Sequence, residues 1–339
     1  MHTQTTITAG LAPDLRPKRV ALSALPVIDL SPMRSGMGKN ALAREIRDAL
    51  VNIGFMYVKG HGVSPGLVTR AYEVSRQFFD LPQAQKDALG IAQSGVALHG
   101  YTGFFQENTN PEKTRDFKEI FDLGRPAADG RVRPFFGPTP WPASLPAFRE
   151  VMERYHDEML RLAHHLMAAI ALSLDLPEDY FAPMMQEPIG IQRLLHYPPQ
   201  DQVADDRLIG IGAHTDYGCL TILSQDKVGG LQVLNRDREW IDAPPLPDTF
   251  IVNIGDMLQR LTNGLYLANL HRVINISGQE RYSIPCFFDV DYDTVFAPLT
   301  QFTGPANPAR YEPIVCGAHK WARYVAAYPH LRAHAGSSS

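Results

Sequence analysis

The amino-acid sequence predicts a mainly β fold with α additions: a C-terminal β core of the sandwich or jelly-roll type, an N-terminal α/β layer and one long packing helix. Three features support this prediction. From about residue 188 onward, short β-forming runs alternate with turn residues. Before them, strand-like and helix-like segments follow one another. A long amphipathic stretch joins the two parts and predicts a helix with one buried face.

The N-terminal part is expected to contain two strands and two helices. "LPVIDL" (25–30) and "FMYVKGHG" (55–62) predict strands, and "ALAREIRDALVNIG" (41–54) predicts a helix that ends at its glycine. A second helix is expected over 65–79. Residues 95–142 are rich in glycine, proline and aromatic residues, so we expect irregular structure there, as is common where loops carry function.

The long helix is predicted from apolar residues that recur every three or four positions and would form one stripe facing a core: Phe148, Met152, Tyr155, Met159, Leu162, Leu166 and Ile170. The β core is predicted from runs punctuated by residues such as Gly229-Gly230 and Pro244-Pro245. These runs are "IGIQRLLHY", "LIGIGAH", "CLTILSQ", "GLQVLN", "TFIVNIG", "HRVINIS" and "RYSIPCFF".

Composition narrows the possible partners and the compartment. The 339 residues carry a net charge of −4 with mixed signs and no basic stripe, so we expect no nucleic-acid partner. The three cysteines include no CxxC pair, which disfavours a disulfide framework and indicates a reducing compartment. We see no secretory signal and no apolar run long enough to span a bilayer. The expectation is a cytoplasmic protein without a membrane partner, for which a monomer is compatible with the sequence.

The stretch "GAHTDYGCLTIL" (212–223) contains two potential metal ligands. His214 and Asp216 lie two positions apart after a strand-like run, so they would project from the same strand face. Alone this spacing is a weak signal, but His271 opens the later run "HRVINIS" and can return on a neighbouring strand. Two histidines and one carboxylate are the ligand set of non-haem Fe(II) oxygenases. Zinc hydrolases use the same atoms, so the three residues leave the metal open.

The run "RYSIP" predicts an anion-binding face. Arg281 and Ser283 alternate on one side of the strand, where a guanidinium and a hydroxyl together would hold a carboxylate. A buried arginine without an anion would be costly. The alternative is that Arg281 pairs with an internal aspartate or glutamate.

These residues resemble a known family. His214-Thr215-Asp216, His271-Arg272-Val273 and Arg281-Tyr282-Ser283 resemble the HxD…H…RxS signature of the isopenicillin N synthase-like branch of the Fe(II)/2-oxoglutarate-dependent dioxygenases, in its bacterial type. The resemblance covers roughly residues 25–330. It extends over further stretches: "LPVIDLS", "GFMYVKGHGV", "FFDLP", "KEIFDLG", "LLHYPPQ", "GGLQV", "VNIGDMLQRLTNG" and "YSIPCFFDVDYD".

The resemblance implies a double-stranded β-helix (jelly-roll) core with the iron near one mouth. The Fe(II) ligands would be His214, Asp216 and His271. The co-substrate 2-oxoglutarate would be held by Arg281, Ser283 and Tyr197, the last of which can also be read as a core-edge aromatic. With O2, such an enzyme converts 2-oxoglutarate to succinate and CO2 while it hydroxylates, desaturates or cyclises a small organic molecule. The chemistry is centred on iron, and no separate acid or base is expected.

The same resemblance divides the chain into predicted segments. These are a flexible tail (1–24), the N-terminal dioxygenase region (25–140), connecting helices (141–186), the Fe(II)/2-oxoglutarate jelly-roll core (187–295) and a C-terminal extension with its tail (296–339).

Substrate-pocket candidates come mainly from the 95–142 region and from positions beside the metal ligands, although each can equally be a packing residue. They are Tyr101, Phe104, Phe105, Glu107, Cys219 and Leu270. The stretch "YLANLHRV" lacks the serine and proline common in the family, at Ala268 and Leu270. Asp256 is expected to be a turn or capping residue rather than a catalytic one. Aromatic residues with few charges predict a small, partly apolar substrate.

Two other functions stay open on the sequence. One is an oxidase of the isopenicillin N synthase or ethylene-forming type, which would use the RxS pair differently. The other is a non-catalytic metal-binding sensor on the same fold, which the intact Asp216 and Arg281 disfavour.

Overall fold

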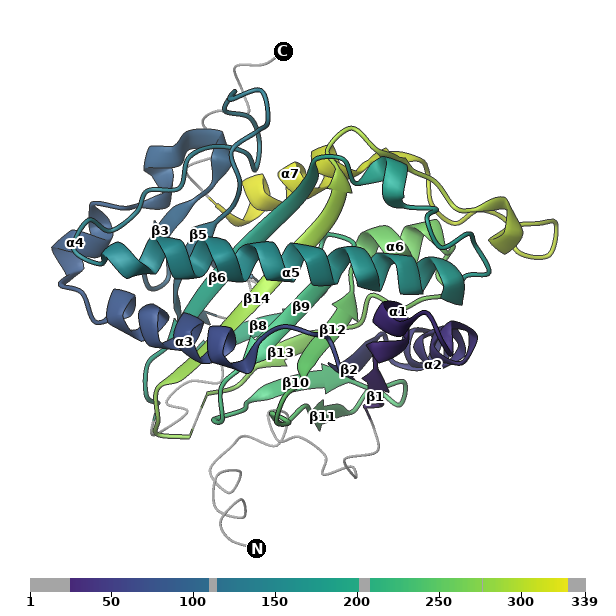
Figure 1. Ribbon diagram of the computed structural model, residues 1–339, viewed down its shortest axis with the longest axis horizontal. Helices are drawn as coiled ribbons and strands as arrows, with labels where there is room; N and C mark the ends of the chain where they lie inside the picture. The colour runs from purple at the N-terminus through teal and green to yellow at the C-terminus, as the bar shows by residue number, and fades with distance from the viewer. Residues whose placement is uncertain (1–24, 110–114, 201–207, 276, 329–339) are drawn as a thin grey trace, which may run out of the picture.

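Two β-sheets face each other and a long helix crosses the outer face of the larger one (Figure 1). The computed structural model describes residues 25–109, 115–200, 208–275 and 277–328. This architecture is the predicted double-stranded β-helix with N-terminal additions and a packing helix, so the predicted fold class is confirmed. The two predicted tails lie outside the described residues.

The N-terminal part forms the predicted strands and helices. In chain order its elements are β1 (Val27–Asp29), α1 (Ser31–Ser35), α2 (Lys39–Asn52), β2 (Phe55–Lys59), α3 (Pro65–Phe79), α4 (Gln83–Asp87), the 3-10 helix η2 (Ile91–Ala97), β3 (Gly100–Thr102), β4 (Arg115–Asp116) and β5 (Glu119–Leu123). Helix α3 begins with a proline, whose missing N–H is not needed in the first turn. The expected strands and helices agree with these bounds to within a few residues.

The expectation of irregular structure over 95–142 is only partly right. Strands β3 and β5 lie inside this region and pair with each other and with β6 at one edge of the large sheet. All five residues of β5 are buried, including Glu119 and Asp122. Because two of the five buried residues of β5 are acidic, its sequence does not show the alternation of apolar and polar residues that predicts a strand. Its stability depends on cations from distant parts of the chain, which a local pattern cannot reveal.

The remaining elements run from the long helix to the last described helix. They are α5 (Pro146–Ser173), the 3-10 helix η3 (Ala182–Met184), β6 (Pro188–Tyr197), β7 (Leu208–Ile209), β8 (Ile211–His214), β9 (Leu220–Gln225), β10 (Leu231–Leu234), β11 (Trp240–Asp242), β12 (Phe250–Ile254), α6 (Asp256–Leu261), β13 (His271–Val273), β14 (Arg281–Asp291), β15 (Val295–Phe296), the 3-10 helix η4 (Thr300–Phe302), β16 (Ile314–Val315) and α7 (Cys316–Ala327).

The large sheet contains strands from both halves of the chain. Its order is β1-β2-β12-β9-β14-β6-β5-β3, in which β1 and β2 are parallel and the other neighbours are antiparallel. The N-terminal strands thus extend both edges of a sheet whose centre comes from the C-terminal half. The small sheet has the order β11-β10-β13-β8. Short two-stranded pairs join β4 to β7 and β15 to β16.

Helix α5 packs on the large sheet and against both α2 and α3, which lie along the same side of it (Figure 1). All seven residues of its predicted apolar stripe are fully buried, which confirms that prediction. Strand β14 presents Tyr282, Ile284, Cys286 and Phe288 to the same core. Because side chains alternate along a strand, the residues between them face the other way, into the space between the two sheets.

The described residues contain no helix with both the length and the apolar character needed to cross a membrane. The three cysteines are buried and form no disulfide.

Two buried histidines should make the fold sensitive to acid. Burial is the main reason that the pKa of His156 on α5 falls to about 3 and that of His99 to about 4. The unfolded chain binds these protons near pH 6.5. The stabilising effect of the neutral imidazoles is therefore complete above about pH 6.5 and is lost as the pH falls toward the folded-state values.

We expect His156→Gln to reduce this pH dependence. At pH 5 the proton linkage of His156 costs the folded state about 2 kcal/mol relative to pH 7.5, and the variant removes that contribution. The measurement is urea unfolding of both proteins at the two pH values. His165→Gln, on the same helix but partly exposed, serves as the control and should change the pH dependence less. An unchanged difference in His156→Gln would contradict the assignment.

Candidate active site

A cavity lies between the two sheets and is bordered at one end by α7. Its lining comes from β6, β9 and β14 of the large sheet and from β8, β10 and β13 of the small sheet. Helix α7 contributes Lys320 and Tyr324, and Tyr328 follows directly after it. The alternating residues Arg281, Ser283, Pro285 and Phe287 of β14 all line this cavity. The cavity therefore uses the strand face that is opposite to the one packed on α5.

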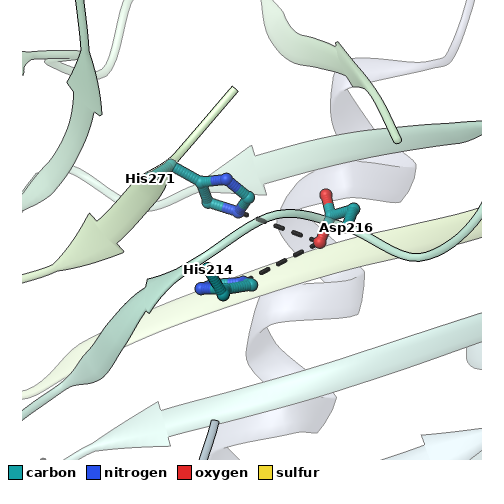
Figure 2. Close-up of side chains that lie close together, drawn as sticks. All are labelled: His214, Asp216 and His271. Atoms are coloured by element: carbon teal, nitrogen blue, oxygen red, sulfur yellow. Dashed lines mark ion pairs between the residues drawn. The ribbon is translucent and has the colours of Figure 1, made fainter. Parts of the chain in front are cut away.

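His214, Asp216 and His271 meet at the small sheet (Figure 2). Antiparallel pairing of β13 with β8 places His271 opposite His214, and their ring centroids are 4.1 Å apart. Nε2 of each histidine lies 3.8 Å from Oδ1 of Asp216. One ligand atom from each of the three residues lies within 4.8 Å of the other two, which is a spacing that one metal ion can bridge.

The expectation that His214 and Asp216 share a strand face is wrong in one respect. Strand β8 ends at His214, and Asp216 lies in the loop that follows. The backbone of this loop is fixed by α6, because the Asp256 N–H donates to the Asp216 carbonyl over 2.9 Å. Gly255 is needed at this contact, since a Cβ there would lie 2.3 Å from the Gly218 carbonyl oxygen. The carboxylate thus reaches the histidines from a fixed loop rather than from a strand.

Hydrogen bonds orient each candidate ligand and leave one atom free to bind a metal. Nδ1 of His214 is 2.8 Å from the Gly212 carbonyl oxygen, and Nδ1 of His271 is 3.3 Å from that of Asn269. Both Nε2 atoms therefore face Asp216. Oδ2 of Asp216 accepts from Thr221 Oγ1 (2.5 Å) and Asn253 Nδ2 (2.7 Å), which leaves Oδ1 toward the histidines. Such partners of the ligands tune metal sites.

The protonation states also suit metal binding. Burial and the adjacent His271 lower the pKa of His214 to about 4, so its imidazole is neutral near pH 7. Burial alone would raise the pKa of Asp216, but His271, His214 and the hydrogen bonds from Thr221 and Asn253 lower it. A neutral imidazole and an ionised carboxylate are the forms that bind metal ions.

Asp256 is not a metal ligand, as expected, but it is not the predicted turn or capping residue, because Gly255 occupies the N-cap position of α6 and no side chain caps the helix. Asp256 is the first residue of α6, and its carboxylate accepts a hydrogen bond from Thr215 Oγ1 (3.1 Å). His319 of α7 lies 3.6 Å from the same carboxylate. Asp256 therefore links the loop between the two ligands to α7 and does not belong to the three-residue cluster.

The opposite part of the cavity contains a buried cation with no carboxylate beside it. Arg281 is fully buried; its Nε donates to the Gly229 carbonyl and its Nη1 to Ser283 Oγ (3.2 Å). Its guanidinium lies 4.6 Å from the centre of the Tyr197 ring. Among the described residues, neither Nη2 of Arg281 nor the Tyr197 hydroxyl has a hydrogen-bond partner. The alternative of an internal acidic partner is wrong within the part of the chain that the structure describes, because no carboxylate lies within 4.0 Å of Arg281.

One of the six predicted substrate-pocket residues lines the cavity. Glu107 does so, whereas Tyr101, Phe104, Phe105, Cys219 and Leu270 do not. The Tyr101 side chain is buried in the core and donates to Glu119. Phe104 and Phe105 pack on Phe117, and Cys219 is a buried residue of the α5 core. Aromatic composition alone did not distinguish core packing from cavity lining.

The sequence reasoning missed several residues around the site. Thr221 and Asn253 hold the Asp216 carboxylate, and a polar residue inside an apolar strand run was the available signal. Arg193 and Tyr328 line the cavity. Asn269 is a further omission: its Nδ2 donates to the carbonyl oxygens of Ile53 (3.0 Å) and Leu234 (2.5 Å). These bonds hold the segment before His271, where Ala268 and Leu270 depart from the family pattern.

Asn253→Ala should weaken metal binding without unfolding the protein. Loss of the Asn253 amide frees the Asp216 carboxylate to rotate, and losing such a contact reduces metal affinity about 10–100-fold. Anaerobic Fe(II) titration measures the effect. Asn52→Ala, an exposed change at the end of α2, is the control and should bind as the parent does. Equal affinities for Asn253→Ala and the parent would show that this contact is not needed.

Comparisons with known proteins agree with this geometry. Residues 25–144 match a family profile described as "non-haem dioxygenase in morphine synthesis N-terminal". Residues 188–290 match the profile of the 2OG-Fe(II) oxygenase superfamily. A 2-oxoglutarate-Fe(II) type oxidoreductase of Aspergillus fumigatus is 37% identical over 300 residues, covering 85% of this chain and 88% of that protein.

Two further relatives have named substrates or ligands. A homoarginine-6-hydroxylase of Glycine max is 35% identical over 320 residues, covering 88% of this chain and 95% of that protein. The crystal structure of a full-length Neurospora crassa protein in complex with alpha-KG (2-oxoglutarate) and thymine superposes with a TM-score of 0.81 at 29% identity, covering 90% of this chain and 97% of that one. By its sequence and its fold, this chain belongs to the 2OG-Fe(II) oxygenase superfamily and is an oxidoreductase that depends on Fe(II) and 2-oxoglutarate.

Proposed function

We propose that this enzyme hydroxylates a C–H bond of a small organic molecule while 2-oxoglutarate is converted to succinate and CO2, with Fe(II) held by His214, Asp216 and His271. The observation that carries the proposal is the joint placement of this cluster and the unpaired Arg281 in one cavity. The relatedness to homoarginine-6-hydroxylases supports hydroxylation as the outcome.

The residues present fit an Fe(II) ion. Two imidazole nitrogens and one carboxylate oxygen converge, while the other polar atoms of these side chains are already engaged in hydrogen bonds. Three protein ligands leave open positions on an octahedral ion. Because Asp216 fills the carboxylate position, no vacancy for a halide ligand is created there, which favours hydroxylation, desaturation or cyclisation over halogenation.

The residues also fit a dicarboxylate co-substrate. The buried Nη2 of Arg281 and the Tyr197 hydroxyl have no partners among the described residues, and Ser283 stands beside them. A carboxylate placed here would satisfy these donors and the buried charge together. Arg281, Ser283 and Tyr197 would thus hold the distal carboxylate of 2-oxoglutarate.

Iron with bound 2-oxoglutarate supplies the O2 activation and the oxidative decarboxylation. The chain's own part is to orient and to exclude water. Arg281 fixes one end of the co-substrate, and apolar residues such as Leu195, Leu231 and Val273 surround the space between it and the metal cluster. Residues of α7 line the other end, beside the position where a substrate would meet the iron.

The compartment and the class of substrate are each supported by a separate observation. Three free buried cysteines are consistent with the cytoplasm. The thymine complex of the Neurospora crassa relative supports a small-molecule substrate. An oxidase of the isopenicillin N synthase or ethylene-forming type is distinguished by its yield of succinate per O2. The bacterial type of the family stays a prediction.

His214→Ala should abolish the visible charge-transfer band that Fe(II) and 2-oxoglutarate give without O2, because it removes one of three metal ligands. Anaerobic absorption spectroscopy measures the band. His61→Ala, distant in sequence and absent from the cavity lining, is the matched histidine control. A band unchanged in His214→Ala would contradict the ligand assignment, and parent enzyme that consumes no 2-oxoglutarate with any substrate would overturn the proposed reaction.

Arg281→Lys should raise the KM for 2-oxoglutarate by about tenfold or more, since lysine keeps the charge but loses the paired donors that a carboxylate requires. Initial rates of succinate formation give the KM. Fe(II) affinity, measured separately, should stay as in the parent, and an unchanged KM would exclude Arg281 as the anchor.

A further inference from the structure

Two arginines line the same cavity, but their surroundings differ in charge. Arg281 lies on β14 in the part assigned to 2-oxoglutarate, and Arg193 lies on β6 near α7. Both guanidinium groups are buried. A buried guanidinium attracts an anion unless the protein already supplies one. The partners of each arginine therefore determine where in the cavity an anionic group can bind.

Arg193 is already paired with two carboxylates. Its Nε and Nη2 donate to the two oxygens of Asp122, each over 2.8 Å, and its Nη1 donates to Glu107 Oε1 over 2.9 Å. Nη2 also lies 3.2 Å from the Tyr328 hydroxyl, which donates to Glu107 Oε2. By contrast, the described contacts of Arg281 are all with uncharged groups.

Burial raises the pKa of Asp122, and the two hydrogen bonds from Arg193 oppose this by stabilising the ionised carboxylate. With Asp122 ionised in this pair, the charge around Arg193 is negative by one unit. Arg193 contributes +1, and Asp122 and Glu107 contribute −1 each. Lys118 lies 2.7 Å from Asp116 and 3.5 Å from Glu107, and Lys320 lies 2.6 Å from Asp289. With these two lysines and two aspartates included, four carboxylates face three cations, so the net charge is still −1. Burial would raise the pKa of Glu107, but Arg193, Lys118 and Tyr328 lower it to about 2, which keeps this carboxylate ionised near neutral pH.

We propose that the Arg193 end of the cavity excludes carboxylate groups and takes an uncharged or cationic nitrogen group of the substrate, whose N–H donates to Glu107. This inference rests on the proposed function, because it concerns the substrate of the same site. A carboxylate entering this end would meet an excess negative charge in a poorly hydrated space, with no unpaired guanidinium to receive it. An N–H donor meets a carboxylate that lines the cavity.

The two ends thus sort ligands by charge. The unpaired Arg281 attracts the dicarboxylate co-substrate, and the excess negative charge near Arg193 keeps the same anion from occupying the substrate position. Glu107 is the residue that makes the difference, since Arg193 and Asp122 alone would be neutral. Thymine, which is bound in the structure of the Neurospora crassa relative, is an uncharged ring with N–H groups.

The first test compares matched compounds. The compounds are compared in sets of three that share one ring and differ in one terminal group: a carboxylate, a carboxamide or an aminomethyl group. One set is indole-3-acetate, indole-3-acetamide and tryptamine, and two further sets carry a phenyl or an imidazole ring. Anaerobic calorimetry measures their binding to enzyme loaded with Fe(II) and 2-oxoglutarate, so no turnover is needed. We expect amides or amines to bind at least about tenfold more tightly than their carboxylates. Tighter binding of the carboxylates, or binding by no amide or amine, would overturn the proposal.

The second test changes the charge. Glu107→Gln brings the net charge of this end from −1 to 0, so amines should lose about tenfold in affinity and the carboxylates should gain. Glu150→Gln, exposed on α5, is the matched control and should keep the parental order. If Glu107→Gln does not fold, Asp122→Asn removes the other carboxylate and should shift the order in the same direction. An order unchanged in the folded variant would overturn the role of Glu107.

The charge-transfer band of Fe(II) and 2-oxoglutarate separates this inference from the proposed function. A parent enzyme that gives the band but prefers carboxylates contradicts only the charge rule at the Arg193 end. A parent enzyme without the band contradicts the metal and co-substrate assignment itself.

Discussion

The register of β14 is the constraint on which the core and the cavity both depend. Its even-numbered residues from Tyr282 to Phe288 complete the core under α5, and its odd-numbered residues from Arg281 to Phe287 line the cavity. A shift by one residue would place Arg281 in the apolar core and Tyr282 in the cavity. Pairing with β6 on one side and β9 on the other fixes the register, so the packing of α5 and the position of the anion-binding group are set together.

The buried charges of this protein follow from the same arrangement. Strand β5 introduces Glu119 and Asp122 into a fully buried sheet edge, and each requires a cation from another element. Lys86 of α4 meets Glu119 over 2.7 Å, while Arg193 of β6 meets Asp122. Removing one partner of such a pair leaves an uncompensated charge, which costs about 3–5 kcal/mol. These pairs therefore fix α4, β5 and β6 relative to one another.

The sequence alone was sufficient for the fold class, the long helix and the residues of the metal cluster, because each has a strong local signal. The stripe from Phe148 to Ile170 has helical spacing, and the HxD pair with His271 gains its meaning from the RxS pair of Arg281 and Ser283, which completes the resemblance to the family. The loop position of Asp216 was not predicted, since a two-residue spacing is compatible with a strand or with a turn. The pocket was predicted least well: Glu107 lines it, but Tyr101 belongs to the core. Which face an aromatic residue presents depends on neighbours that are distant in sequence.

The position of Tyr328 in the cavity lining affects how substrate selectivity can change among related enzymes. Tyr328 contacts Glu107, 221 positions earlier in the chain, and neither residue belongs to the strands that carry the metal cluster. If Glu107 recognises the substrate as proposed, recognition of the molecule to be oxidised and activation of O2 are encoded in separate stretches of sequence. Substitutions in the segment after β3 and in α7 can redesign selectivity while β8, β13 and β14 preserve the reaction, so variant libraries for new activities are best confined to these two stretches.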